Sequence, residues 1–124
     1  MSGPVEAAIR AHVPAGTCLP TPTGRATFLV HELSSTELVL LLGPKQTRTP
    51  FTWICLEGVS EFLRRRGWIR VGANRDVRGA PGTLDGYLKG CIKRQTADYI
   101  AVVLESAGLV ELDRERPARV RLLD

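Results

Sequence analysis

The strongest constraint on the fold lies in the last third of the chain, where a helical pattern stops at one glycine and a strand pattern follows at once. Apolar residues recur at helical spacing from Ala97 to Ala107, and Thr96 is a favoured residue type for the start of a helix. Gly108 is typical of a helix end, and residues 109–123 alternate apolar and charged residues on both sides of a charged turn. Because a helix and a hairpin with apolar faces bury those faces against each other, the sequence predicts an α+β fold.

A second helix is expected immediately before this segment. Thr83 can cap it, and apolar residues at positions 84, 88, 91 and 92 have helical spacing. Polar residues at 93–95 then separate the two helices. The last 42 residues are therefore expected to form a helix, a short turn, a second helix and a β-hairpin.

The first half of the chain predicts a helix followed by a β-hairpin. Helical spacing of apolar residues predicts the helix over residues 5–13, and Ser34 and Ser35 separate two apolar runs that predict the hairpin. The run from Leu38 to Leu42 is expected to be the better buried strand. The other expectations here are an irregular connection over 17–24, hairpin strands over 25–31 and 37–42, and a polar loop over 43–49.

A central helix is expected to begin near Pro50, because proline is favoured in the first turn of a helix. Its apolar stripe covers residues 53–63. Arg64–Arg66 are expected in the last helical turn, where cations interact favourably with the helix dipole, and Gly67 is expected to end the helix. A short strand over 68–71 and a flexible, exposed loop over 72–82 are expected to follow.

The length of 124 residues is typical of one domain, so we expect a single domain over 1–124 in which loop 72–82 is the candidate internal boundary. The longest apolar run, residues 38–42, has five residues, whereas a membrane helix needs about 20. The first residues lack the basic stretch and apolar core of a secretory signal. We therefore expect no membrane contact and a cytoplasmic location.

Neither the cysteines nor the histidines have the spacing of a metal or redox site. Cys18, Cys55 and Cys91 are 37 and 36 residues apart, and His12 and His31 lie in unrelated segments. Buried free thiols in a reducing compartment are the expected state of the cysteines. The sequence predicts no cofactor and no metal ion.

The net charge of +4 is concentrated in one segment, residues 64–78, which contains six arginines and a single acid, Asp76. Of the 17 basic residues 14 are arginine, whose planar guanidinium pairs well with phosphates and base edges. The segment favours a polyanion as partner. A codon bias toward arginine and the capping of the central helix would explain the same residues.

The string from Val103 to Leu112, VLESAGLVEL, resembles the junction between recognition helix and wing in winged-helix proteins, bacterial transcription regulators especially. The helix stops at Gly108, and the next two apolar residues turn back into the core as a strand. The resemblance covers residues 83–123 and implies that the start of the second helix faces the major groove of DNA while the hairpin tip contacts phosphates. On this resemblance the groove residues are Lys93, Arg94, Gln95, Thr96 and Tyr99, and the wing residues are Arg114 and Arg116, with Arg119 as a further candidate.

The leading hypothesis is a non-enzymatic nucleic-acid-binding domain for duplex DNA, acting as a regulator or as the DNA-reading module of a larger enzyme. The sequence contains no nucleophile, phosphate-loop or metal-ligand motif that would indicate catalysis. The expected backbone contacts outside the resembling segment are Arg64, Arg65, Arg66, Arg70, Arg75 and Arg78, and Trp68 is the candidate for stacking on a base.

The alternative is a protein-interaction or dimerisation module built on a winged-helix-like fold. Residues 83–124 contain seven basic and seven acidic residues, and a neutral segment suits a protein partner as well as DNA. One basic surface joining 64–78 to 93–96 would favour DNA, whereas a bare apolar groove would favour a protein partner.

Overall fold

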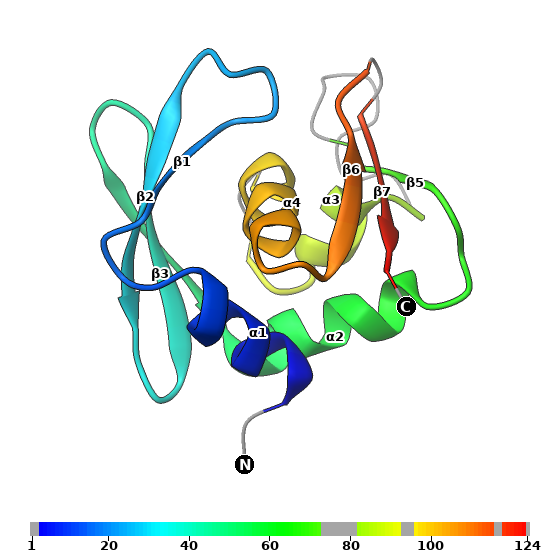
Figure 1. Cartoon of the computed structure of the whole chain (residues 1–124), viewed down its shortest axis with the longest axis horizontal. Coiled ribbons are helices and arrows are strands. Elements are labelled where there is room, and N and C mark those ends of the chain that lie inside the picture. The colour runs from blue at the N-terminus through cyan, green and yellow to red at the C-terminus, as the bar shows by residue number, and fades with distance from the viewer. Residues whose placement is uncertain (1–2, 73–81, 93–95, 116–117, 124) are drawn as a thin grey trace.

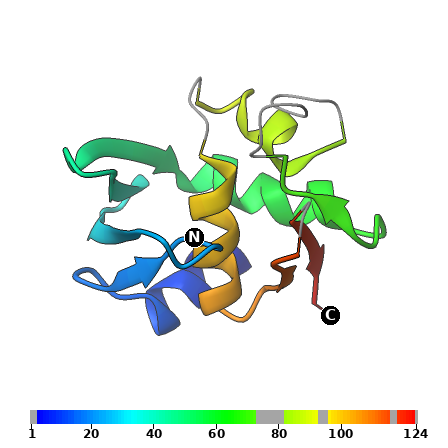
Figure 2. The same cartoon turned by 90° about the horizontal axis from the view of Figure 1, so that it is seen from above.

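Helix α4 (Ala97–Ser106) runs through the middle of the protein, between two antiparallel sheets (Figure 1). The computed structural model describes residues 3–72, 82–92, 96–115 and 118–123. Seen from above, α4 has the first sheet on one side and the C-terminal hairpin on the other (Figure 2). One apolar core contains side chains from both sheets and from every described helix, so the α+β prediction is confirmed and the chain forms a single domain.

The first sheet has four strands in the order β1-β2-β3-β4. The expected hairpin is its central pair, and the Ser34 hydroxyl holds the turn by accepting a hydrogen bond from the Glu37 N–H at 3.0 Å. Leu38, Val39 and Leu40 are completely buried, because the strand that carries them has a neighbour on each side. The strands, each antiparallel to the next, are β1 (Cys18–Pro20), β2 (Thr27–Leu33), β3 (Glu37–Leu42) and β4 (Thr47–Thr52).

Two segments expected as loops contain strands, so those predictions are wrong. Residues 18–20 pair with β2, and residues 47–49 open strand β4 alongside β3. Pro50 lies within β4 and not at a helix start. An edge strand tolerates proline because one of its sides needs no backbone donor. In both segments the neighbouring strand supplies hydrogen bonds that the local sequence does not specify.

Helix α2 (Trp53–Leu63) starts three residues after the expected proline. The Thr52 hydroxyl caps it by accepting a hydrogen bond from the Cys55 N–H at 3.1 Å. The helix also ends earlier than expected, because Arg64 is an extended C-cap and Arg65 has a φ of +62°. The three arginines therefore lie in an exposed turn after the helix, and their placement in the last helical turn is corrected.

Helix α1 (Pro4–His12) matches the expected N-terminal helix and packs on α2. Its free backbone donors are satisfied by α2 and not by a local cap. The Glu57 carboxylate accepts hydrogen bonds from the N–H groups of Val5, at 3.1 Å, and Glu6, at 2.8 Å. Gly3 leaves room for this carboxylate, since a Cβ at that position would overlap it.

The second sheet has the order β5-β7-β6, so the C-terminal strand lies between the other two. The expected helix before Gly108, the stop at this glycine (φ +78°) and the C-terminal hairpin are confirmed. None of the described helices is long and apolar enough to cross a membrane. The strands are β5 (Ile69–Arg70), β6 (Val110–Asp113) and β7 (Arg119–Leu122).

Helix α3 (Leu84–Leu88) begins at the expected cap, where the Thr83 hydroxyl accepts a hydrogen bond from the Gly86 N–H at 2.9 Å. It ends four residues before Ile92, the last residue of the expected helix. Lys89 is the C-cap, and the N–H of the next residue, Gly90, donates a hydrogen bond to the Tyr87 carbonyl in a tighter turn. The polar break at 93–95 and residues 73–81 of the expected loop lie outside the described residues.

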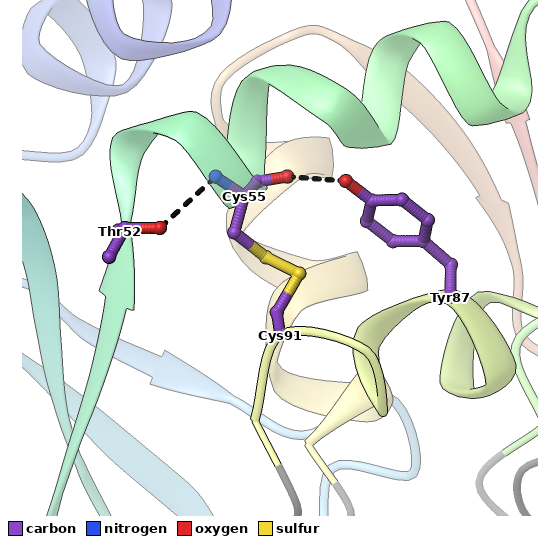
Figure 3. Close-up of a disulfide and its surroundings, with 4 residues drawn as sticks. All are labelled: Thr52, Cys55, Tyr87 and Cys91. Atoms are coloured by element: carbon purple, nitrogen blue, oxygen red, sulfur yellow. Dashed lines mark hydrogen bonds between the residues drawn. A yellow bond between two sulfur atoms is a disulfide. The ribbon is translucent and has the colours of Figure 1, made fainter.

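Cys55 and Cys91 form a disulfide, which corrects the expectation of free thiols for this pair (Figure 3). Their Cα atoms are 6.1 Å apart because α3 packs on α2. The Tyr87 hydroxyl donates a hydrogen bond to the Cys55 carbonyl at 2.9 Å, and its ring stacks on Phe62 with the centroids 5.2 Å apart. Cys18 is a free thiol, exposed where a buried one was expected.

Candidate nucleic-acid interface

Seven of the residues predicted to contact nucleic acid lie in the described part of the chain. Arg64–Arg66 are exposed in the turn after α2, and Arg70 is exposed on β5. Arg114 is exposed in the connection between β6 and β7, whereas Thr96 is buried and Tyr99 is half-buried. The other six, Arg75, Arg78, Lys93, Arg94, Gln95 and Arg116, lie outside the described residues.

The start of α4 is covered, which corrects the expectation that Thr96 and Tyr99 face a DNA groove. Thr96 is 1% exposed, and the Tyr99 ring packs edge-to-face on Phe28 of β2 with the centroids 5.1 Å apart. The physical reason is the composition of α4, which has buried apolar side chains at five consecutive positions, 100–104. A helix that is apolar all round is buried on all sides.

Two carboxyl groups lie near the starts of α3 and α4. Asp85 is completely buried and pairs with the Lys89 ammonium at 3.3 Å. Burial raises the pKa of Asp98 above its ordinary value, and the nearby charge of Asp85 raises it further. Neither carboxylate lines the grooves described below, and no group of three or more metal-ligating side chains is found in the described part of the chain.

Arg114, the predicted wing residue, is held by an ion pair within the protein. Its guanidinium donates two hydrogen bonds to the Glu105 carboxylate near the end of α4, at 2.6 and 2.5 Å. The hydrogen bond to Glu105 raises the pKa of Arg114. This bidentate pair fastens the hairpin to α4, and the Arg114 charge is compensated where a phosphate contact was expected.

The outer face of the second sheet gathers arginines from two separate segments. Arg70 of β5 lies directly opposite Arg119 of β7, so their side chains share one face of the sheet. The Trp68 ring, 37% exposed, has the guanidinium carbons of Arg119 and Arg121 at 5.5 and 4.9 Å from its centroid. The contact therefore links strand β7 to the arginine-rich segment 64–78, in which Trp68 lies.

Both β7 arginines also pair across the hairpin with acids of β6. Arg119 contacts Asp113 at 2.7 Å, and Arg121 contacts Glu111 at 2.7 Å. The Glu115 N–H and Arg119 lower the pKa of Asp113 by hydrogen bonds to its charged form. The arginine side chains of both pairs are 47% exposed, and ion pairs at the surface contribute little stability and are screened by salt.

A groove of about 760 Å³ continues this surface toward the end of α2. Its lining residues include Arg64, Arg65 and Gly67 from the turn after α2 and Arg121 from β7. Arg64 contacts Glu61 at 3.0 Å, and this pair is exposed. We call Arg64, Arg65, Arg70, Arg119 and Arg121, together with Trp68, the arginine face.

Of the arginine-face residues, Arg64, Arg65 and Arg70 were predicted from the sequence as backbone contacts. Arg119 was a further candidate for the wing, and Trp68 was the candidate for stacking on a base. Arg121 was missed, although a signal for it exists. In strand β7 the buried Val120 lies between two arginines, and strand alternation places both of them on the outer face. Arg66 belongs to a different contact, since its guanidinium carbon lies 4.7 Å from the centroid of Phe62.

A second groove, of about 510 Å³, lies beside the disulfide. Ile54 is one of its lining residues and is 87% exposed, the largest exposure among the large apolar side chains that the structure describes. The other lining residues come from strands β3 and β4, the start of α2, α3 and the turn after α3: Glu37, Pro50, Phe51, Thr52, Cys55, Tyr87, Gly90, Cys91 and Ile92.

Comparison with known proteins finds no family model, no curated protein and no solved structure that matches this chain.

Proposed function

We propose that this protein is a non-enzymatic nucleic-acid-binding domain that holds the phosphate backbone of duplex DNA on its arginine face. The observation that carries the proposal is the groove in which Arg64 and Arg65 meet Arg121 from a distant part of the chain. Within the described residues Arg65 and Arg70 make no ion pair, so their guanidinium groups are available to phosphates. Arginine suits this role because its planar fork matches two phosphate oxygens at once.

The arrangement of the C-terminal elements supports the resemblance to winged-helix proteins. Helices α3 and α4 and the hairpin β6–β7 follow one another in the order that the resemblance implies, and β7 joins the hairpin to β5. The covered start of α4 favours a docking mode different from a recognition helix in the major groove. Contacts from the arginine face would reach phosphates and carry little sequence preference, as suits a cytoplasmic regulator or the DNA-holding module of a larger enzyme.

The test is binding of fluorescent random-sequence duplex DNA, measured by anisotropy over a range of salt concentrations. If about five arginines contact phosphates, the logarithm of the binding constant should fall against the logarithm of the salt concentration with a slope of roughly −4 to −5. The double variant R65E with R70E should make that slope less steep, to roughly −2 to −3, and weaken binding at least tenfold at low salt.

The matched control is R25E with K45E, which makes the same change in net charge at exposed positions in turns of the first sheet. Both double variants should melt like the wild-type chain, since none of the four side chains is buried. Equal weakening of binding by both pairs, or no binding at low ionic strength, would overturn the proposal.

The second candidate, a protein-interaction or dimerisation module, is favoured by the exposure of Ile54 in a groove that also contains Pro50, Phe51 and Ile92. If this surface mediates self-association, the wild-type chain should sediment as a concentration-dependent dimer, and I54S should be monomeric. A monomeric wild-type chain at all concentrations would leave only a different protein as the partner of this groove.

A further inference from the structure

The two cysteines of the disulfide both line the second groove but differ in how much of each residue is exposed to solvent. Cys91 is an exposed residue in the turn after α3, whereas Cys55 is 7% exposed on the inner side of α2 (Figure 3). Thiol–disulfide exchange begins when a thiolate from solution attacks one of the two sulfurs. The geometry therefore directs attack to Cys91 and makes Cys55 the leaving group.

Cys55 occupies a place that suits a leaving thiolate. It lies in the first turn of α2, an 11-residue helix. Its N–H donates a hydrogen bond to the hydroxyl of Thr52, the N-cap residue. Backbone N–H groups in a first helical turn stabilise negative charge, including that of a thiolate. The exposure of Cys91 sets the direction of attack, and the position of Cys55 in the first helical turn offsets part of the cost that burial imposes on its thiolate.

The helix that carries Tyr87 would remain in place if the disulfide opened. The Tyr87 hydroxyl bonds to the Cys55 carbonyl, its ring stacks on Phe62, and Leu88 is completely buried. Beyond Leu88 the N–H groups of Cys91 and Ile92 both donate to the Leu88 carbonyl at 2.9 Å. The Lys89 ammonium also pairs with Asp85 at 3.3 Å, and the Ile92 side chain packs against the core. Opening the disulfide would therefore loosen residues 89–92 without releasing α3.

We propose that Cys55 and Cys91 form a reversible redox pair and that Cys91 is the site at which a small cellular thiol of the glutathione class becomes attached. In the first step the thiolate attacks the Cys91 sulfur, the bond to Cys55 breaks, and its electron pair leaves with Cys55 as a thiolate. In the second step another thiolate attacks the mixed disulfide and releases Cys91. Two thiols are oxidised to one disulfide, and the protein pair is reduced by two electrons.

The experiment uses the full chain carrying C18S, because Cys18 is an exposed free thiol that would react on its own. Iodoacetamide added before any thiol should label neither remaining cysteine. After brief exposure to millimolar reduced glutathione and quenching with iodoacetamide, peptide mass spectrometry should find glutathione on Cys91 and the acetamide group on Cys55. Hydrogen exchange should accelerate over residues 89–92 and stay unchanged over α3.

Two single-cysteine variants separate this proposal from a merely structural bond. In C55S Cys91 is a free thiol, so oxidised glutathione is used instead: the Cys91 thiolate attacks it, forms the mixed disulfide and releases one reduced glutathione. After free glutathione is removed, the adduct on Cys91 should persist, because no neighbouring thiol can displace it. In C91S the buried Cys55 should react with iodoacetamide at least about tenfold more slowly than Cys91 does in C55S. Glutathione on Cys55, labelling of both cysteines before reduction, or a bond that opens only after denaturation would each overturn the proposal.

Discussion

Gly58 lies in the middle of α2, where glycine weakens a helix by about 1 kcal/mol relative to alanine. The reason for the glycine is the close approach of α3. A Cβ at position 58 would overlap the Tyr87 hydroxyl, which is fixed by its hydrogen bond to the Cys55 carbonyl. Helix α2 thus loses some intrinsic stability so that a tyrosine from the next helix can lie flat against it.

We therefore expect G58A to destabilise the protein by about 1–2 kcal/mol, although alanine is the better helix former. Y87F removes the overlapping oxygen, so G58A should cost less in the Y87F background. Urea unfolding of the four proteins in this double-mutant cycle measures the coupling free energy. Strictly additive effects would contradict the assigned contact.

Asp98 gives a prediction for the pH dependence of stability. Burial, and secondarily the charge of Asp85, raise its pKa in the folded protein, so the folded state holds this proton more tightly than the unfolded chain. The associated stability is fully present below the ordinary pKa of about 4 and is lost as the pH rises through the raised value of the folded state. D98N should remove this loss, so the variant should gain stability relative to wild type as the pH rises through that range. Urea midpoints of both proteins over an acid-to-neutral series measure the difference, and parallel curves would count against it.

The capping of α1 illustrates how elements depend on one another. Gly3, the N-cap residue of α1, has no side chain to offer, and the helix begins only because Glu57 of α2 accepts hydrogen bonds from two of its N–H groups. The carboxylate also lies at the positive end of the α1 dipole. A single side chain therefore supplies a cap that is normally local in sequence.

We expect E57A to destabilise the protein by about 1–2 kcal/mol, and E57Q, which keeps one acceptor oxygen, to cost less. E61A is the matched control on the same helix, because Glu61 makes only an exposed pair with Arg64 and its loss should change stability by about 0.5 kcal/mol or less. Thermal melts of the three variants test this order, which would be refuted by equal losses in E57A and E61A.

At the scale of the whole molecule, α4 connects the two halves of the chain. The first sheet covers one side of it through the contact between Phe28 and Tyr99, and strand β6 packs on another. The segment that resembles a winged helix is therefore integrated into a larger core and does not form a separate unit.

A fragment of residues 52–124 should accordingly fail to fold on its own, since it leaves the α4 side chains that the first sheet and α1 cover exposed to water. We expect helical far-ultraviolet circular dichroism without a cooperative thermal transition or near-ultraviolet signal, with the full chain as reference. A cooperative transition in the fragment would show an independent C-terminal domain and would make the start of α4 accessible to DNA after all.

Periodicity and capping residues in the sequence were enough to predict the helix 97–107, its stop at Gly108, the C-terminal hairpin, the N-terminal helix and the hairpin around Ser34. These features are decided within a few residues, by the spacing of apolar side chains and by the backbone freedom of glycine. The exposure of Arg64, Arg65 and Arg70 followed from the same local signals, because charged residues beside a helix end and on a strand edge remain in water.

Partners distant in the sequence decided the rest. Strands β1 and β4 exist because β2 and β3 supply their hydrogen bonds, and Cys55 meets Cys91 because α3 packs on α2. The start of α4 is covered because the first sheet folds over it, and Arg121 joins Arg64 because β7 lies between β5 and β6. Local patterns determine which segments become helices or strands, but the burial of one face against another depends on contacts that only the complete chain brings together.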